Sequence, residues 1–309
     1  MAGMLNNLIA NGWPYVSVIV PCYNYGVYVG EAIRSILAQN YPCFELIVID
    51  DGSSDNSAEV IERVLADWEG YPGVHRVEFI RQQNQGVSAA INSGLKSALG
   101  KYVATFDADD LMPQGRISLQ VQHMEQNPEV GCVGGIAVRI DEFGNKLPKK
   151  EKERGVIRYN FDDALKEALV IGGGMALFRK EALDQAGRYD AKIKIQDFQI
   201  TLKVAAAGFF IDILPDVVTY YRKHEGSLSG NYKMELMCGF EVINEYRDNR
   251  YYESAKVKLI VKALRMAAVH DKAMAWSLIK QVPFKYWDKT MLKRVRYFLF
   301  KKAKKAKRA

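Results

Sequence analysis

The sequence of 309 residues is poor in the features that mark secreted and membrane-spanning proteins. Its four cysteines, Cys22, Cys43, Cys132 and Cys238, show neither CxxC pairing nor framework spacing, so we expect reduced thiols. No run of about 18 uncharged apolar residues occurs, and no spanning helix is predicted. The first residues lack the basic segment, apolar core and cleavage site of a secretory signal, which favours a cytoplasmic location.

Positive charge is scarce over most of the chain and concentrated towards its end. Residues 231–309 hold 20 Lys and Arg against 7 acids, whereas the first 230 residues hold 23 against 29. We therefore expect an acidic body with a basic extension. The length and the 49% hydrophobic content suit one large domain with an appendage. The predicted division is an N-terminal lead (1–14), a domain (15–230, with halves 15–130 and 131–230) and the extension (231–309).

The first third of the chain alternates apolar runs with helical patterns. Strands are expected at 16–20, 44–49, 74–80 and 102–106, with helices at 27–39, 55–68 and 87–99 between them. Strands rich in Val and Ile that alternate with helices indicate a parallel sheet covered on both faces. Right-handed crossovers then predict an α/β fold with a doubly wound, mainly parallel sheet. Further strands are expected at 131–140, 209–213 and 216–222, helices at 160–169 and 197–207, and a charged exposed loop at 141–155.

Polar segments follow the four predicted strands: PCYNYG, DDGSSDNS, RQQNQG and DADD. In doubly wound sheets, ligands bind beyond the carboxyl ends of the strands, so these segments should converge on one rim. The last segment aims Asp107, Asp109 and Asp110 at one point, where the carboxylates repel one another unless a cation neutralises them. The structural alternative is an Asp-rich helix cap before Pro113.

Four segments, in this order and spacing, resemble the family 2 glycosyltransferases: SVIVPCYN (17–24), ELIVIDDGSSDNS (45–57), NQGVSAAINSGL (84–95) and FDADD (106–110). The resemblance covers roughly residues 15–230. It implies the GT-A fold of nucleotide-diphospho-sugar transferases and an inverting transfer from a nucleotide diphosphate sugar, with a UDP-sugar favoured. It also implies a divalent metal, Mn²⁺ or Mg²⁺, which neutralises the two phosphates while keeping coordination positions open for them.

The resemblance also assigns roles on the donor side. It implies that Asp109 ligates the metal and that Asp107 binds the ribose hydroxyls or is a further metal ligand. Asp51, the second of a pair of acids, is implied to accept the N–H of the base. Tyr23 is expected to stack on or pack beneath the base, or else only to fill the core. The full set of implied donor-binding residues is Pro21, Tyr23, Asn24, Asp51, Asn84, Gly86, Asp107 and Ala108.

On the acceptor side, Asp197 in IKIQDFQI matches the acid that the family uses as general base. Many members have an acidic pair there, whereas Gln196 precedes Asp197 in this chain. The alternative for Asp197 is a helix N-cap. The segment GGGMALFRK (172–180) resembles the acceptor-side strand, where Arg179 is expected to face a phosphate or only solvent.

A last segment of the domain, YRKHEGSLS (221–229), resembles a loop that closes over the diphosphate in many bacterial members. It makes His224 an expected third metal ligand, beside Asp109 and Asp107. Arg222 or Lys223 is a candidate contact for the diphosphate.

The basic extension has its own pattern. Residues 256–309 contain 17 Lys and Arg against two acids, and apolar residues recur at helical spacing among them. Such a stripe indicates a helix lying in an anionic membrane interface. Packing or a dimer contact, and nucleic-acid binding, are the alternatives, and no nucleic-acid partner is expected. The stripe consists of Trp287, Met291, Val295, Phe298 and Leu299.

Together these patterns predict a peripheral enzyme on the inner face of the cell membrane. Its expected partners are a nucleotide diphosphate sugar and a glycan or lipid-linked glycan acceptor, in cell-surface polysaccharide or lipopolysaccharide assembly. Two alternatives stay open: a polyprenyl-phosphate sugar transferase, and a non-catalytic basic tethering or nucleic-acid-binding protein with a degenerate sugar-nucleotide domain. Homo-oligomerisation is also left open.

Overall fold

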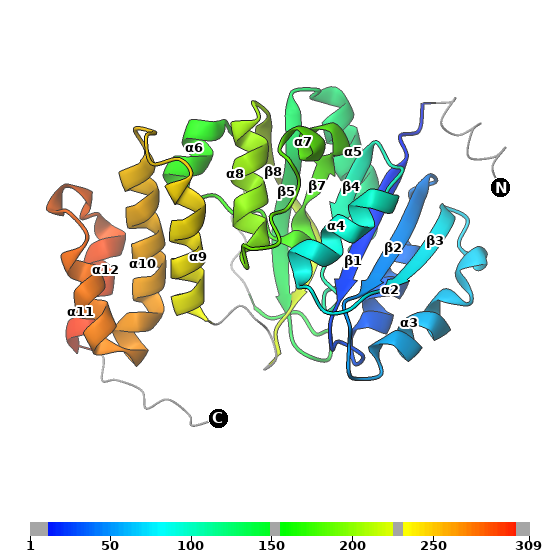
Figure 1. Ribbon diagram of the computed structural model, residues 1–309, viewed down its shortest axis with the longest axis horizontal. Coiled ribbons are helices and arrows are strands. Elements are labelled where there is room, and N and C mark those ends of the chain that lie inside the picture. The colour runs from blue at the N-terminus through cyan, green and yellow to red at the C-terminus, as the bar shows by residue number, and fades with distance from the viewer. Residues whose placement is uncertain (1–11, 149–154, 225–230, 301–309) are drawn as a thin grey trace. The chain divides into compact units, whose positions relative to one another are not determined.

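The computed structural model describes residues 12–148, 155–224 and 231–300, and contains an eight-stranded sheet in the order β3-β2-β1-β4-β7-β5-β8-β6 (Figure 1). The first four strands in this order pair in parallel, β7 is antiparallel to both neighbours, and β6 is antiparallel to β8. The predicted doubly wound, mainly parallel sheet is confirmed. The strands are β1 (Val16–Cys22), β2 (Phe44–Asp50), β3 (Val74–Arg81), β4 (Tyr102–Thr105), β5 (Val130–Ile140), β6 (Ile157–Tyr159), β7 (Leu177–Arg179) and β8 (Phe210–Arg222).

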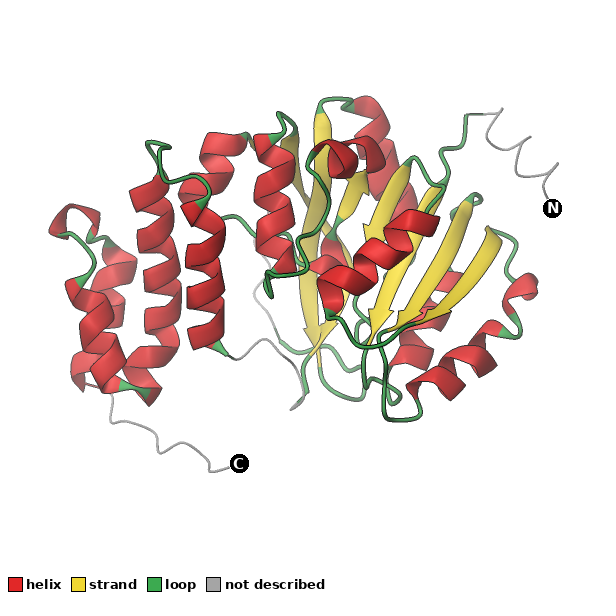
Figure 2. Cartoon of the chain, in the orientation of Figure 1, coloured by secondary structure: helices red, strands yellow, loops and turns green. Residues whose placement is uncertain are grey.

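Helices cover both faces of this sheet (Figure 2). On one face, Val18 and Val20 of β1 belong to a core cluster with residues of α2, α3 and α5. On the other face, a Cβ atom on Gly94 of α4 would lie 2.7 Å from Ile19, so glycine lets this helix approach the sheet closely. The alternation of Val18, Ile19 and Val20 thus supplies an apolar surface to both layers. The helices are α2 (Val29–Leu37), α3 (Ser57–Leu65), α4 (Val87–Ser97), α5 (Arg116–Gln126), α7 (Lys180–Gln185) and α8 (Gln196–Ala206).

The structure differs from the predicted elements in the second half of the sheet. The strands expected at 209–213 and 216–222 form the single strand β8, with Pro215 inside it. Proline is tolerated there because β6 pairs only with residues 211–213, and the register against β5 shifts between Gly134 and Ile136. Helix α5 and strand β6 were not predicted.

The chain divides into two compact units. The first consists of the described residues within 1–161 and 170–225, and holds the whole sheet. The second combines 162–169 with the described residues after 226. In this second unit α10 packs against α9, α11 and α12. None of its helices, nor any other helix in the described part of the chain, is long and apolar enough to cross a membrane. The bounds are α6 (Phe161–Glu167), α9 (Tyr232–Asn244), α10 (Tyr252–His270), α11 (Lys272–Lys280) and α12 (Lys289–Phe300).

The apolar stripe predicted in the extension packs largely inside the second unit. Met291 is fully buried, and the indole N–H of Trp287 donates to the carbonyl of Val282 at 3.1 Å. Phe298 stacks on Trp276 with ring centroids 5.9 Å apart. Packing inside the second unit therefore accounts for Trp287, Met291 and Phe298 of the stripe. The exposed large apolar residues of this unit are Met237, Trp276, Phe284, Leu292, Leu299 and Phe300.

Candidate active site

The polar loops leave the sheet at one edge. Strands β1, β2 and β4 are parallel neighbours, with Cys22 opposite Asp50 and Ile19 opposite Thr105. The residues that follow these strands, Tyr23, Asp51 and Asp107, therefore emerge on the same side. The sequence-based expectation of a single polar rim holds for these three loops.

The loops after β1, β2, β3 and β4 are called the first to the fourth loop. Asn24 connects the first loop to the second. Its backbone N–H donates to Ser53 Oγ at 2.9 Å, and its side-chain oxygen accepts the N–H of Ser54 at 2.8 Å. The φ angle of Asn24 is +58°, a left-handed conformation that asparagine tolerates better than most residues. Asn24 was predicted to face the nucleoside, and the structure gives its side chain this bracing role as well.

Asp51 ties the second loop to the third. This buried carboxylate accepts the side-chain amide of Gln82 at 2.7 Å and the backbone N–H groups of Gln85 and Gly86 at 3.0 and 2.8 Å. A Cβ atom on Gly52, which has a φ of +75°, would lie 2.8 Å from the backbone nitrogen of Asn84. Glycine at this position therefore allows the two loops to touch.

The remaining donor-side residues differ in their exposure. Tyr23 is 47% exposed, which excludes the alternative that it only fills the core. Asn84 and Gly86 are exposed at the start of α4, whereas Ala108 is buried. Pro21 is half-buried within β1. A flat aromatic ring and an exposed amide thus border the rim formed by the braced loops.

The DADD segment packs against the glycines of 172–174. Asp107 Oδ2 accepts the N–H of Gly174 at 3.1 Å. A Cβ atom on Gly173 would lie 3.1 Å from Asp107 Oδ1 and 3.3 Å from Asp197 Oδ1. The carboxylate predicted on the donor side and the one predicted on the acceptor side therefore both lie close to Gly173.

The carboxylates carry an excess of negative charge. Burial raises the pKa of Asp107 well above its usual range, and the nearby Asp110, Asp197 and Asp109 add to the rise. Burial and then Asp109 raise the pKa of Asp110 to about 8. Asp110 is almost fully buried, and its Oδ2 atom has no hydrogen-bond partner among the described residues. Such a cluster favours the binding of a cation.

The donor set fits a divalent metal at Asp109. His224 Nε2 lies 3.0 Å from Asp109 Oδ2, so an imidazole nitrogen and a carboxylate oxygen already meet. The rings of Tyr25 and Tyr28 pack against His224, with centroids 5.8 and 4.7 Å away. Asp107 faces the glycines instead, and in the described part of the chain no three His, Cys, Asp or Glu side chains form a metal-ligand cluster. A metal here would take two protein ligands, leaving positions for phosphate and water oxygens.

Arg222 holds this region together instead of facing a diphosphate. Its buried guanidinium donates to the carbonyls of Asp109 and Glu142 at 2.8 and 2.7 Å and pairs with Glu31 at 2.7 Å. All three nitrogen atoms of its guanidinium group therefore bind other groups of the protein. Lys223 is exposed, and its contact with the diphosphate stays a prediction.

Asp197 lies in the first turn of α8, where Ile195 is the N-cap residue, so the N-cap alternative is wrong. Its half-buried carboxylate accepts the N–H of Gly173. Burial raises the pKa of Asp197 to about 6, and the bond from Gly173 limits the rise. A carboxylate with a pKa near the working pH suits a general base.

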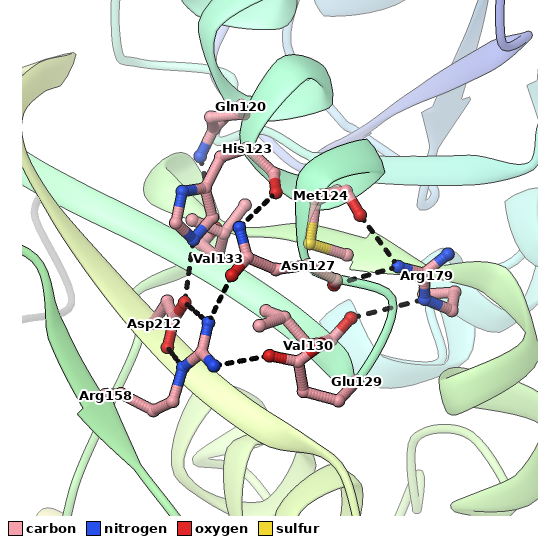
Figure 3. Close-up of polar contacts among 10 residues, drawn as sticks. All are labelled: Gln120, His123, Met124, Asn127, Glu129, Val130, Val133, Arg158, Arg179 and Asp212. Atoms are coloured by element: carbon pink, nitrogen blue, oxygen red, sulfur yellow. Dashed lines mark hydrogen bonds and ion pairs between the residues drawn. The ribbon is translucent and has the colours of Figure 1, made fainter.

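Two buried arginines have roles that the sequence did not reveal. Arg179 was expected to face phosphate or solvent, but Figure 3 shows it bound to the carbonyls of Met124 and Val130, at 3.0 and 3.2 Å. Arg116, which the sequence-based analysis missed, donates to the carbonyls of Gly174 and Ala176 at 2.6 and 3.2 Å. These hydrogen bonds hold the backbone of Gly174 and Ala176 in place. No local pattern marks Arg116 as buried, because the carbonyls that it binds lie about 60 residues away.

Known proteins similar to this chain are glycosyltransferases. An uncharacterized glycosyltransferase of Nostoc sp. is 29% identical over 245 residues, which cover 75% of this chain and 74% of that protein. The poly-beta-1,6-N-acetyl-D-glucosamine synthase of Staphylococcus epidermidis is 30% identical over 207 residues, 65% of this chain and 48% of that protein. The match to an uncharacterized glycosyltransferase of Rickettsia conorii, 39% identical over 112 residues, covers only 17% of that relative's length.

Solved structures share the fold. S. aureus TarS in complex with UDP-GlcNAc matches 87% of this chain and 82% of its own, with a TM-score of 0.66 and 17% identity. The mannosyltransferase PcManGT from Pyrobaculum calidifontis, in complex with GDP-Man and Mn²⁺, matches 96% and 93%, with a TM-score of 0.59 and 20% identity. These likenesses show the GT-A fold. A family model described as glycosyl transferase family 2 matches residues 17–187, more than half of the chain, and the protein therefore belongs to this family of glycosyltransferases.

Proposed function

We propose that the protein transfers a sugar from a nucleotide diphosphate sugar, with a UDP-sugar favoured, to a hydroxyl of a glycan or lipid-linked glycan, with inversion of the anomeric centre. The observation that carries this proposal is that the carboxylates of Asp107 and Asp197 both lie close to Gly173. One acid belongs to the donor loop and the other to the predicted acceptor side. A sugar held at this point has both within reach.

The first three loops form the nucleoside site in this proposal. Asp51 anchors the third loop through Gly86, and its remaining lone pair accepts the N–H of the base. The exposed ring of Tyr23 stacks on the base, and Pro21, Asn24 and Asn84 border it. Complexes of the similar proteins with UDP-GlcNAc and GDP-Man support this donor class.

Asp197 is the general base of the proposed reaction. Its carboxylate removes the proton of the acceptor hydroxyl, whose oxygen attacks the anomeric carbon as the bond to the diphosphate breaks. The bond from Gly173 N–H orients the carboxylate, and the buried surroundings keep it basic enough to hold the proton. A single displacement of this kind inverts the configuration.

Asp109 and His224 are the proposed metal ligands, with Asp107 nearby. Bound Mn²⁺ or Mg²⁺ would neutralise the charge of the departing diphosphate. Asp110 positions the segment by accepting the backbone N–H of Arg222 at 2.9 Å. The complex of PcManGT with Mn²⁺ supports this choice of cation.

We further propose that the second unit attaches the enzyme to an anionic membrane surface, where lipid-linked acceptors for cell-surface polysaccharide or lipopolysaccharide are found. Phe284 and Phe300 are 82% and 79% exposed, and Leu299 is 62% exposed. Lysines lie over the aromatic rings beside them, including Lys280 over Trp276. Exposed aromatic and aliphatic side chains among lysines suit the interface of a bilayer.

A donor screen tests the proposed function. We expect UDP-sugars, compared with GDP- and dTDP-sugars, to raise the melting temperature of the full chain most, and only with Mn²⁺ or Mg²⁺ present. Asp197→Asn should keep this shift and lose sugar transfer. A variant that transfers sugar at the wild-type rate would contradict the role of Asp197, and the lack of a shift with every nucleotide sugar would contradict the proposed function.

A further inference from the structure

A cavity of about 610 Å³ lies in the first unit beside the segment 172–175. Its size is that of a pocket for a small organic molecule or part of a larger one. Most of its wall is aliphatic, and Tyr221 is the one aromatic residue that lines it. The aliphatic and small lining residues are Gly135, Ile136, Ala137, Leu147, Pro148, Gly155, Ile157, Met175, Ile213 and Leu214.

The local irregularity of the sheet explains how consecutive residues can line one cavity. In a regular strand, only alternate side chains face the same side. Here the register between β5 and β8 shifts between Gly134 and Ile136, and again between Ile136 and Ala137. A bulge of this kind turns neighbouring side chains towards the same space and is frequent beside active sites.

The cavity adjoins the candidate active site at two points. Met175 lines it and directly follows Gly174, which donates to Asp107. Tyr221 also lines it and directly precedes Arg222, whose side chain donates to the carbonyl of Asp109 at 2.8 Å. A ligand in the cavity is therefore close to the reacting groups.

One cationic side chain lines the cavity beside Tyr221. Arg139 lines it and is paired with Tyr221 across β5 and β8. Arg139 is exposed, and it forms no ion pair with another described residue. A phosphate on a ligand would find a guanidinium there, and no carboxylate is among the described residues that line the cavity. Sugar rings, by contrast, need polar partners and flat aromatic faces, and among the described lining residues only Arg139 and Tyr221 supply these.

We infer that the cavity binds the aliphatic chain of an amphiphilic acceptor, with the chain against the residues of β5, β8 and β6 that line the cavity and an anionic headgroup at Arg139 and Tyr221. This inference rests on the proposed function and specifies its acceptor as a lipid-linked one. The chain would hold the acceptor beside Met175, and its sugar hydroxyl would extend towards Asp197. Acceptors without the chain would lose this anchorage.

Binding of n-alkyl phosphates of 4 to 12 carbons to the full chain, measured by calorimetry below their micellar concentrations, tests the inference. We expect one saturable site whose affinity rises about fourfold per added methylene until the cavity is full. Ala137→Phe should weaken dodecyl phosphate binding at least tenfold by filling the cavity, and the matched Ala137→Ser should not. Should Ala137→Phe fail to fold, Ile157→Phe fills the cavity from the edge strand.

Arg139→Gln separates the headgroup from the chain. It should weaken binding of octyl phosphate several-fold and leave binding of 1-octanol unchanged. The inference is overturned by the absence of saturable binding, by equal affinity in Ala137→Phe, or by glucose 1-phosphate binding as tightly as dodecyl phosphate. These outcomes are distinguishable from failure of the proposed function, because donor binding is measured separately by the thermal shift with nucleotide sugars.

Discussion

Asp107 and Asp197, which are 90 positions apart in the sequence, face the same backbone position: their Oδ1 atoms lie 3.1 and 3.3 Å from the point where a Cβ atom on Gly173 would sit. The DADD segment after β4 contributes one carboxylate and the first turn of α8 the other. A glycine leaves the position next to both carboxylates free of a side chain. This arrangement makes Gly173 a position where a single methyl group has a defined effect.

Gly173→Ala should reduce sugar transfer by about tenfold or more, because the new methyl group contacts both carboxylates and displaces them. The measurement is the rate of nucleoside diphosphate release with donor and acceptor present. Gly70→Ala is the matched control, since a Cβ atom at Gly70 meets nothing within 4 Å. Equal rates in the two variants would show that the Asp107–Asp197 geometry does not matter.

The pH dependence of the reaction should report Asp197. Its pKa is raised to about 6 by burial, and a general base acts only when ionised. The value of kcat/KM should therefore be constant above about pH 7 and fall about tenfold per pH unit below 6. Residual activity of Asp197→Asn should lack this fall. A profile of unchanged shape in that variant would assign the titration to another group.

Loss of the metal ligands should remove metal-dependent donor binding. Asp109→Ala leaves His224 alone, and one neutral imidazole holds Mn²⁺ or Mg²⁺ weakly. The stabilisation by UDP-sugar with Mn²⁺ should disappear in Asp109→Ala and after chelation of the wild type. His224→Gln should weaken it less. As a control, exposed Asp216→Ala should keep the full shift. A full shift in Asp109→Ala would place the metal elsewhere.

Membrane attachment should depend on exposed phenylalanines of the second unit. Phe284→Ala and Phe300→Ala should each weaken binding to vesicles of anionic lipid by about tenfold, because each buries a ring in the interface. High salt should weaken the wild type as well. Phe143→Ala is the control, since Phe143 is 80% exposed but lies in the first unit. If a variant with both Phe284→Ala and Phe300→Ala co-sedimented with the vesicles as the wild type does, this surface would be excluded as the membrane-binding site.

The stability of the first unit should depend on the ion pair of the buried carboxylate of Asp212. Asp212 is fully buried, and Arg158 binds both of its carboxylate oxygens, at 2.9 and 2.8 Å, while His123 lies 2.7 Å away (Figure 3). Arg158→Met leaves the buried charge undercompensated and should lower the free energy of unfolding by about 3 kcal/mol. Urea denaturation measures this loss.

The matched control for that cluster is Arg188→Met. Arg188 pairs with Asp184 four positions earlier, and both side chains are exposed by more than a third. Such a surface pair contributes less than about 0.5 kcal/mol. A similar small loss for Arg158→Met would show that Asp212 does not depend on Arg158 for the compensation of its charge.

The sequence was sufficient for most strands of the parallel half. The Val and Ile runs gave strand positions within two residues of those observed for β1, β2 and β3, because burial on both faces requires continuous apolar content. The convergence of Asp51 and Asp107 on one rim then followed from the parallel order of these strands. Residues whose position depends only on where a strand ends are predictable in this way.

Residues whose partners are distant in the chain were not predictable. Nothing near Arg222 indicates that its guanidinium reaches Glu31, and nothing near Arg116 indicates that it supports Gly174. The helical spacing of Met291 and Phe298 identified an apolar stripe but not what the stripe packs against. These outcomes are decided by tertiary packing, which local periodicity does not encode.

The bonds from Asn24 to the second loop and from Asp51 to the third have a consequence for engineering the donor preference. Hydrogen bonds to the next loop hold each loop in shape. A loop that is grafted alone from a relative would therefore lack the partner residues of these bonds. Chimeras that exchange residues 21–26, 50–57 and 82–87 as one block should preserve nucleotide recognition, whereas single-loop grafts should unravel the neighbouring loop.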